Sequence, residues 1–286
     1  MLELPEAAVM AAQLRDTITG KKSKNVIAAQ SPHKFAWFHG DPQLYRGLLA
    51  GRTIGAAAGL GGMVEIEADG AVILFGDGVG LRYHSPEDER PAKHQLLIEF
   101  EDHAAVSGSV QMYGGLWCFA EGGFDNPYYK QAKEKPSPLS AKFDQAYFDR
   151  LISPPEARKL SAKVFLATEQ RIPGLGNGVL QDILYIARIH PKTKIGALEN
   201  SAIDGLFSAV KSTLAEMAAR GGRDTERDLF GRPGGYQTKV SKHTAGKPCP
   251  LCGEMIRKEN YMGGSIYYCD GCQKPTAGCP SAGSGR

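Results

Sequence analysis

Four cysteines near the C-terminal end constrain the fold of this chain more than any other feature. They form two C-x-x-C pairs, CPLC at 249–252 and CDGC at 269–272, separated by sixteen residues. Each tight turn places two sulfurs on one face, and two such turns complete the tetrahedral thiolate shell that Zn²⁺ favours. Four ligands leave no open coordination position. The sequence therefore predicts one structural zinc ion on a β-hairpin that turns at MGG, with these ligands: Cys249, Cys252, Cys269 and Cys272.

The composition is that of a globular protein whose partner could be an anion. Of 286 residues, 42% are hydrophobic and 23% charged, which is ordinary for such proteins. No apolar stretch approaches the roughly 18 residues of a membrane span, and no secretion leader opens the chain. We therefore expect a cytoplasmic protein without membrane association, in which paired cysteines bind metal. The net charge is +3, and residues 227–274 contain eight Lys or Arg against four Asp or Glu. This balance permits a phosphate-bearing partner without requiring one.

The spacing of apolar residues predicts an N-terminal helix and a β-rich region. Pro5 and Glu6 suit the first turn of a helix from Pro5 to Thr19, and Gly20 ends it. The stripe expected to be buried consists of Val9, Met10, Leu14 and Ile18. Short apolar runs then alternate with turn residues, which predicts a β-sandwich or barrel reaching about residue 129. These runs are KNVIAA, KFAWFH, RTIGAAA, MVEIEA, AVILFG, HQLLIEF and AAVSGSVQMY.

The period of the apolar pattern changes to that of helices after a polar segment. QAKEKPSPLS contains two prolines and predicts a linker. Helical spacing then predicts an all-helical domain over about 139–220. The segments that carry this spacing are AKFDQAYFDRLI, ARKLSAKVFLATEQ, VLQDILYIARI and AIDGLFSAVKSTLAEMAAR.

A glycine-flanked turn, PGLGN at 173–177, lies between two of these helices. We expect Asn177 to cap the second helix, and Gly174 and Gly176 to let the backbone approach a ligand closely. Free amides at a helix start attract phosphate. A plain helix–helix turn explains the local chemistry equally well. This motif therefore supports phosphate binding only together with the other motifs of the chain.

The motifs together resemble the formamidopyrimidine-DNA glycosylase / endonuclease VIII family over nearly the whole chain. MLELPE is similar to the family's opening MPELPE, and AKHQLLIEFED to its K-H strand. KPSPLSAKF resembles its interdomain segment, and KVFLATEQRIPGLGNGVLQDILYIARIHP its helix–two-turn–helix core. GGRDTERDLFGRPGGY resembles its lesion-loop region, and CPLCGEMI…YYCDGCQ its zinc finger. Any one match could be chance, but six in the right order are not.

This resemblance implies a multidomain α+β fold. An N-terminal helix with an antiparallel β-sandwich is expected to span residues 1–129, and a linker 130–138. The helix–two-turn–helix DNA-binding domain is expected to span 139–225. A lesion-loop remnant with the zinc-finger β-hairpin would span 226–275, and residues 276–286 would be a disordered tail.

The resemblance also implies site residues. Glu3 takes the position of the acid–base glutamate, and Glu6 that of the second acidic residue; the alternative for both is that they complement the helix dipole. Lys93 and His94 fall on the K-H strand, where phosphate contacts are expected; a solvated lysine and a strand-end histidine are the alternatives. Asn177, Gly174 and Gly176 match the phosphate clamp. Arg257, on the finger hairpin, is a further expected DNA contact.

Several positions depart from the family pattern. Leu2 stands where the family has a nucleophilic proline, exposed when the initiator methionine is removed. We expect Met1 to remain, because removal requires a small second residue; its primary amine is then a possible nucleophile. Gln111 stands where an arginine fills the gap left by an extruded base, and Tyr113 where phenylalanine wedges. Gly264 stands where the finger has its arginine.

These departures leave two functions open. The first is a base-excision DNA repair enzyme, a monomeric DNA glycosylase associated with the bacterial nucleoid. It would bind damaged duplex DNA, extrude a modified base and hydrolyse its N-glycosidic bond with weak or absent β-lyase activity, since hydrolysis needs no covalent amine. The second is a catalytically inactive damaged-DNA-binding protein of the same fold. A third function, that of an RNA-binding zinc-ribbon protein, is disfavoured by the match along the whole chain.

Overall fold

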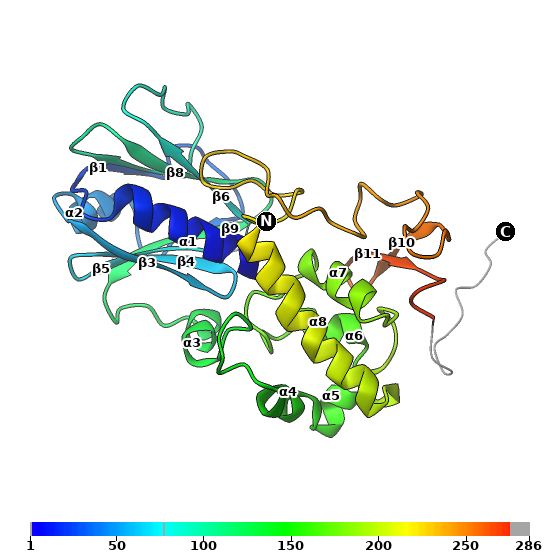
Figure 1. The fold of residues 1–286 in the computed structure, drawn as a ribbon. Helices are drawn as coiled ribbons and strands as arrows, with labels where there is room; N and C mark the ends of the chain where they lie inside the picture. Colours follow the sequence, from blue (N-terminus) through cyan, green and yellow to red (C-terminus); the bar gives the residue numbers. More distant parts are fainter. Residues whose placement is uncertain (1, 77, 275–286) are drawn as a thin grey trace. The chain divides into compact units, whose positions relative to one another are not determined.

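The computed structural model describes residues 2–76 and 78–274, which form two compact units. The N-terminal unit consists of Met1–Lys135 and Met217–Gln237, and the C-terminal unit of Pro136–Glu216 and Thr238–Arg286. Figure 1 shows the helices and strands of both units in order along the chain. Among the described residues, no helix is both long and apolar enough to cross a membrane.

The N-terminal helix α1 (Leu4–Ile18) forms where the sequence predicts it. Glu3 precedes it in an extended conformation, and Pro5 occupies its first turn. Met10, Leu14 and Ile18 are buried as expected, whereas Val9 is half-buried. The helix packs closely on the neighbouring strand. The close approach is seen at Gly59, where an added Cβ would come within 3.0 Å of the Ala7 backbone.

Two sheets sandwich the core of the N-terminal unit, which confirms the predicted α+β fold. One sheet is antiparallel with the order β1-β7-β8-β6; the other has the order β2-β9-β5-β4-β3, in which β2 pairs with β9 in parallel. Buried side chains of both sheets and of α1 form one hydrophobic cluster. The strands are β1 (Ser23–Ala28), β2 (Ala36–Trp37), β3 (Ile54–Leu60), β4 (Met63–Ala68), β5 (Ala71–Phe75), β6 (Val79–His84), β7 (Leu96–Phe100), β8 (Ala105–Val110) and β9 (Gly114–Ala120); a 3-10 turn η1 (Pro42–Leu44) and helix α2 (Tyr45–Leu49) follow β2.

The segment that the sequence suggests as a linker begins as a helix, α3 (Pro127–Glu134). Asn126 caps it by accepting hydrogen bonds from the amides of Tyr128 and Tyr129. Lys133 of this helix forms an ion pair with Glu65 of β4 at 3.0 Å. A capping asparagine before a proline is a recognisable helix start, which the polar composition of the segment obscured.

The C-terminal unit is helical, as predicted, and ends in the zinc-finger hairpin. The expected helix over ARKLSAKVFLATEQ is two short ones, because Leu160 is extended and the hydroxyl of Ser161 starts a new helix by accepting from the Val164 amide. The helices are α4 (Gln145–Ile152), α5 (Pro155–Lys159), α6 (Ala162–Ala167), α7 (Val179–Ile186), the 3-10 turn η2 (Ile195–Ala197) and α8 (Asn200–Ala219).

The hairpin consists of β10 (Ile256–Tyr261) and β11 (Gly264–Cys269). Met262 and Gly263 form its turn with φ values of 47° and 76°, the left-handed geometry that two-residue hairpin turns require. The predicted turn at MGG is therefore confirmed.

Residues 217–237, which include the sequence that resembles a lesion loop, pack as part of the N-terminal unit. Leu229 is fully buried in the core of this unit. Gln13 of α1 accepts a hydrogen bond from the Leu229 amide at 3.0 Å and donates one to Asp228 at 2.9 Å. This segment is thus anchored beside α1, the helix that carries Glu3 and Glu6 at its start.

Candidate functional site

Glu3 and Glu6 converge on one buried arginine, Arg223. Glu6 accepts two hydrogen bonds from the guanidinium, Nε to Oε1 at 2.9 Å and Nη2 to Oε2 at 2.8 Å, and a third from the Arg223 amide at 3.2 Å. Glu3 is held by one longer contact, from Nη1 to Oε2 at 3.3 Å. All three residues are buried: Glu3 is 5% exposed, Glu6 4% and Arg223 2%. The arginine therefore fixes the relative positions of both carboxylates.

The electrostatics of this cluster favour the charged form of Arg223. Burial alone lowers the pKa of Arg223, but the charges of Glu3 and Glu6 outweigh burial and raise that pKa above its usual value. Two buried carboxylates without a cation would repel each other and would be costly to desolvate. The hollow beside Glu6 has essentially no volume that a water molecule could enter, so it is not a preformed ligand pocket.

Leu2 is 3% exposed and belongs to the hydrophobic core of the N-terminal unit. Its side chain carries no nucleophile and packs away from water. Met1, the other residue that could supply an amine, lies outside the described residues.

Lys93 and His94 precede β7 in the N-terminal unit. Lys93 is exposed, whereas His94 is 6% exposed. Nδ1 of His94 lies 2.9 Å from the Pro91 carbonyl oxygen, which fixes the proton on this nitrogen. Nε2 is buried and has no hydrogen-bond partner among the described residues. A buried polar atom of this kind calls for an explanation, and a ligand is one.

Gln111 and Tyr113 lie in the turn between β8 and β9. Gln111 is exposed, and its carbonyl oxygen lies 3.3 Å from Nε2 of His33. The ring of Tyr113 lies 5.7 Å from that of Trp37.

In the C-terminal unit, Asn177 does not cap a helix, so this expectation was wrong. Gly178 is the N-cap residue of α7, without a side-chain hydrogen bond. The Asn177 side chain instead donates to the Ser265 carbonyl oxygen of β11 at 2.9 Å, and its Oδ1 is buried without a partner among the described residues. Gly174 has a φ of 78°, a conformation that side chains disfavour, and Gly176 accepts a hydrogen bond from the Leu180 amide.

Lys163 of α6 is a site residue that the motifs did not single out. It is 5% exposed, and its ammonium group donates to the Tyr261 carbonyl oxygen and, at 3.3 Å, to that of Met262. These carbonyls belong to the turn of the finger hairpin. A Cβ added at Gly264 would lie 3.5 Å from the Lys163 ammonium and 3.6 Å from the Asn177 side chain. No sequence signal distinguishes Lys163 from other helix lysines.

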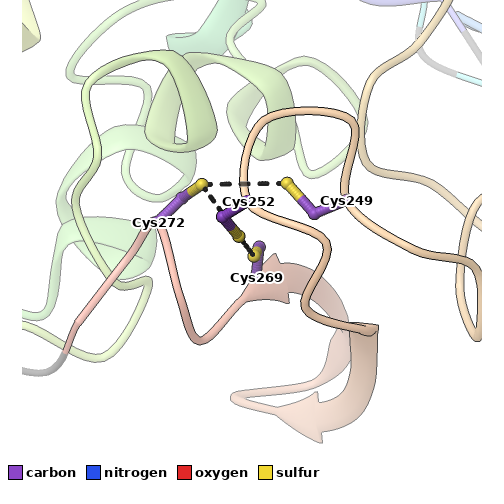
Figure 2. A group of neighbouring side chains, drawn as sticks. All are labelled: Cys249, Cys252, Cys269 and Cys272. Atoms are coloured by element: carbon purple, nitrogen blue, oxygen red, sulfur yellow. Dashed lines mark hydrogen bonds between the residues drawn. The ribbon is translucent and has the colours of Figure 1, made fainter.

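The four predicted metal ligands form a single cluster. Their sulfur atoms lie within 4.8 Å of one another, and the closest pairs are separated by 3.3 to 3.7 Å. Figure 2 shows Cys249, Cys252, Cys269 and Cys272 directed toward one another. Zn–S bonds of about 2.3 Å in a tetrahedral shell place sulfurs roughly 3.8 Å apart. The donor set and its geometry therefore fit one structural Zn²⁺.

The protonation chemistry of the cluster also fits a cation. Burial raises the pKa of Cys249, but hydrogen bonds from the Tyr185 hydroxyl and from nearby amides outweigh burial and lower that pKa to about 6. Burial and hydrogen bonds to the neighbouring thiols raise the pKa of Cys272 to about 12. Four adjacent thiols thus resist becoming thiolates together unless a positive ion lies between them.

Arg257 is exposed on β10 and forms an ion pair with Asp270. Its side chain is 64% exposed, so it can reach a partner in solvent.

Comparisons with known proteins agree with this architecture. No family model matches the chain. The formamidopyrimidine-DNA glycosylase of Listeria innocua is 27% identical over 280 residues, 96% of this chain and 100% of that protein. The same enzyme of Prochlorococcus marinus is 31% identical over 192 residues, 65% of this chain and 64% of that protein.

Solved structures share the fold over nearly the whole chain. The Lactococcus lactis Fpg in complex with DNA that contains an abasic site has a TM-score of 0.81 at 23% identity, and covers 95% of this chain and 99% of its own. MutM (Fpg) of Thermus thermophilus has a TM-score of 0.79 at 22% identity, with 96% and 99% covered. The chain is thus similar from end to end to formamidopyrimidine-DNA glycosylases and shares the fold of Fpg, and its hairpin carries a four-cysteine cluster.

Proposed function

We propose that this protein binds damaged duplex DNA, extrudes a modified base and hydrolyses its N-glycosidic bond, with weak or absent β-lyase activity. Similarity along nearly the whole chain supports glycosylase action, because the relatives carry that name and structures of the same fold contain DNA with an abasic site or an N7-benzyl-Fapy-dG. The convergence of Glu3 and Glu6 on Arg223 carries the proposal. It places two carboxylates beside one guanidinium at the start of α1.

Glu3 is the residue proposed to act on the sugar. Glu6 accepts two hydrogen bonds from the Arg223 guanidinium, whereas Glu3 takes the position that the resemblance gives to the acid–base glutamate. A charged carboxylate can accept a proton from water while the water oxygen bonds to the anomeric carbon. The C–N bond breaks as this C–O bond forms, and its electron pair leaves with the base, which takes up a proton. The same negative charge stabilises the cationic character that develops on the sugar.

Weak lyase activity is proposed from Leu2. A lyase of this family needs an amine to form a Schiff base, and Leu2 stands at the position of the family's proline with its side chain in the core. Hydrolysis needs only water and a carboxylate.

The DNA contacts proposed for this function come from both units. Lys93 and His94 would contact phosphate, His94 through its orphaned Nε2. In the C-terminal unit, the contacts would come from Asn177, Gly174, Gly176 and Arg257.

A second candidate, a damaged-DNA-binding protein without catalysis, is favoured by one observation. The carboxylates are paired with Arg223, and the hollow beside Glu6 is too small for a nucleoside. Catalysis would require the segment around Arg223 to move when DNA binds.

One experiment separates the two candidates. Duplexes with a panel of oxidised bases or an abasic site, and undamaged duplex, are incubated with the protein and then treated with alkali or borohydride. Alkali-dependent breaks that disappear in Glu3→Gln, without a borohydride-trapped adduct, are the expected result. A trapped adduct would contradict the weak-lyase proposal. Tight binding without breaks on any duplex would favour the binding protein.

A further inference from the structure

A second hollow lies in the N-terminal unit, and none of its lining residues has a role in the proposed function. Water can enter about 600 Å³ of it, a volume within the range of roughly 300–1,000 Å³ that small-molecule sites have. The hollow, here called the basic hollow, is formed by β1, α2, the loop after β6, the end of β7 and the turn before β8. The lining side chains with a part in the argument are Lys24, Asn25, Arg46, Arg90, Glu99 and His103.

Arg90 holds the walls of the basic hollow together. Its Nη1 donates hydrogen bonds to the carbonyl oxygens of Ser85 at 3.0 Å and Asp88 at 2.8 Å. Its Nη2 donates to the carbonyl oxygen of His103, so the loop after β6 is tied to the turn between β7 and β8. Because these bonds lie within the protein, the backbone of the hollow is preorganised, which lowers the entropic cost of binding.

The two carboxylates of the basic hollow already have partners. Asp88 accepts a hydrogen bond from the Ser85 amide at 2.7 Å. Glu99 accepts one from the Asn25 side chain at 3.0 Å, and its other oxygen lies 4.0 Å from Nε of Arg90. These contacts engage the carboxylates and Arg90 with one another and with the backbone, and they leave the remaining cations of the hollow available.

Lys24 of β1 and Arg46 of α2 are the cations that remain. Both are exposed, and neither side chain makes a hydrogen bond or ion pair with any residue that the structure describes. Lysine presents a point charge and arginine a planar fork of donors, and both bind phosphate oxygens. Lys24, Arg46 and Arg90 outnumber the two carboxylates, so the hollow is also net positive.

His103 adds an exposed flat ring to the lining. Its φ of 67° is left-handed, a conformation in which histidine is more frequent than most side chains. The His103 amide donates to the Phe100 carbonyl oxygen at 3.1 Å, so the turn that carries the ring is fixed. Histidine rings stack on nucleobases, and the side-chain oxygens of Asn25 and Glu99 accept hydrogen bonds from hydroxyl or amino groups.

We propose that the basic hollow binds a nucleoside monophosphate, with the phosphate on Lys24 and Arg46 and the base against His103. A DNA duplex presents a row of phosphates along its axis and pairs with cations spread over a surface, whereas these cations share one hollow. The site includes neither Glu3 nor Glu6 and none of the proposed DNA contacts. Nucleotide binding there is therefore a separate property from base release.

Titration calorimetry of the full chain with adenosine monophosphate (AMP), adenosine and inorganic phosphate tests this site. AMP should bind about tenfold more tightly than adenosine, which lacks the charged contacts. It should also bind about tenfold more tightly than inorganic phosphate, which lacks a base to stack.

Lys24→Ala and Arg46→Ala should each weaken AMP binding about tenfold. Neither substitution removes a contact within the described chain, so both variants should fold, and urea unfolding checks this. Lys22→Ala is the matched control and should bind AMP like wild type. Lys22 is an exposed lysine of the same segment, but it pairs with Glu101 at 3.4 Å and does not line the hollow.

Absence of AMP binding at millimolar concentration would overturn the proposal. Equal affinities for AMP and adenosine, equal affinities for AMP and phosphate, or an equal loss in Lys22→Ala would also overturn it. Undamaged duplex DNA is added as a competitor. Displacement of AMP by the duplex, with a duplex affinity that falls in Lys24→Ala and Arg46→Ala, would assign the hollow to the DNA backbone and overturn the nucleotide site.

Discussion

Arg223 donates two hydrogen bonds to Glu6, at 2.9 and 2.8 Å, although 217 positions separate the two residues in sequence and both are almost fully buried. This bidentate pair ties the segment after α8 to the start of α1. It also brings the guanidinium to Glu3. The pair therefore links the fold of the N-terminal unit to the geometry of its candidate catalytic residue.

Replacement of Arg223 by methionine should destabilise the protein by about 3–5 kcal/mol, because it leaves two buried carboxylates without a cation. The free energy of unfolding in urea measures this loss. Arg227→Met removes an exposed arginine of the same segment and should change stability by about 0.5 kcal/mol or less. The triple variant Glu3→Gln, Glu6→Gln, Arg223→Met should be more stable than Arg223→Met alone. Equal stability of Arg223→Met and wild type would contradict a structural role for the pair.

Glu3 and Glu6 should respond differently to the same substitution. Glu6→Gln removes the charge that holds Arg223 and should lower stability by about 1.5–3 kcal/mol. Glu3→Gln should slow base release by about a hundredfold or more, because its carboxylate is the one proposed to act on the sugar. Urea unfolding and single-turnover base release separate the two effects. Normal base release in Glu3→Gln would remove Glu3 from the chemistry.

The parts of the molecule that follow local rules could be predicted from the sequence. The zinc ligands, the hairpin turn at Met262 and α1 depend on residues close together in the chain, so spacing and capping residues reveal them. The ion pair of Arg223 could not be predicted, because nothing near Arg223 in sequence indicates which carboxylates it meets.

Competing local signals account for other differences between the predicted and the observed structure. Asn177 looks like a helix cap, but α7 begins one residue later and the side chain binds the hairpin. Strands β6 and β9 were missed because glycines interrupt their apolar pattern. In β9, a Cβ at Gly115 would come within 2.1 Å of the Trp117 ring, so packing requires this glycine. The burial of Lys163 depends on carbonyls about a hundred positions away.

Cys252→Ser should abolish zinc binding and unfold the hairpin, because three thiolates no longer complete the tetrahedral shell. Zinc content of the purified protein and hydrogen exchange of β10 and β11 measure the two effects. Cys118→Ser is the control: this buried thiol lies on β9, outside the cluster, and its loss should leave zinc content unchanged. Retention of stoichiometric zinc in Cys252→Ser would contradict the assignment of four ligands.

Lys163→Met should loosen the turn of the hairpin while zinc remains bound. Charged hydrogen bonds to backbone carbonyls are worth about 1.5–3 kcal/mol, and the carbonyls of Tyr261 and Met262 would lose their buried donor. Amide exchange at the turn should accelerate by about tenfold or more. Lys159→Met, at an exposed lysine of α5, should leave this exchange rate unchanged. Unchanged exchange in Lys163→Met would show that the turn needs no ammonium.

His84 should make the stability of the N-terminal unit depend on pH. Burial lowers the pKa of His84 below its usual 6.5, and the charge of Arg90 lowers it further. The unfolded chain therefore binds a proton more readily than the folded protein, so stability is fully present above about pH 6.5 and decreases as the pH falls through 6.5 toward the folded-state value. His84→Gln keeps a hydrogen-bonding group for Ser107, which lies 2.8 Å from Nε2, but does not titrate. Urea unfolding at a series of pH values should give a flatter profile for His84→Gln than for wild type. Parallel profiles would assign the pH dependence to other groups.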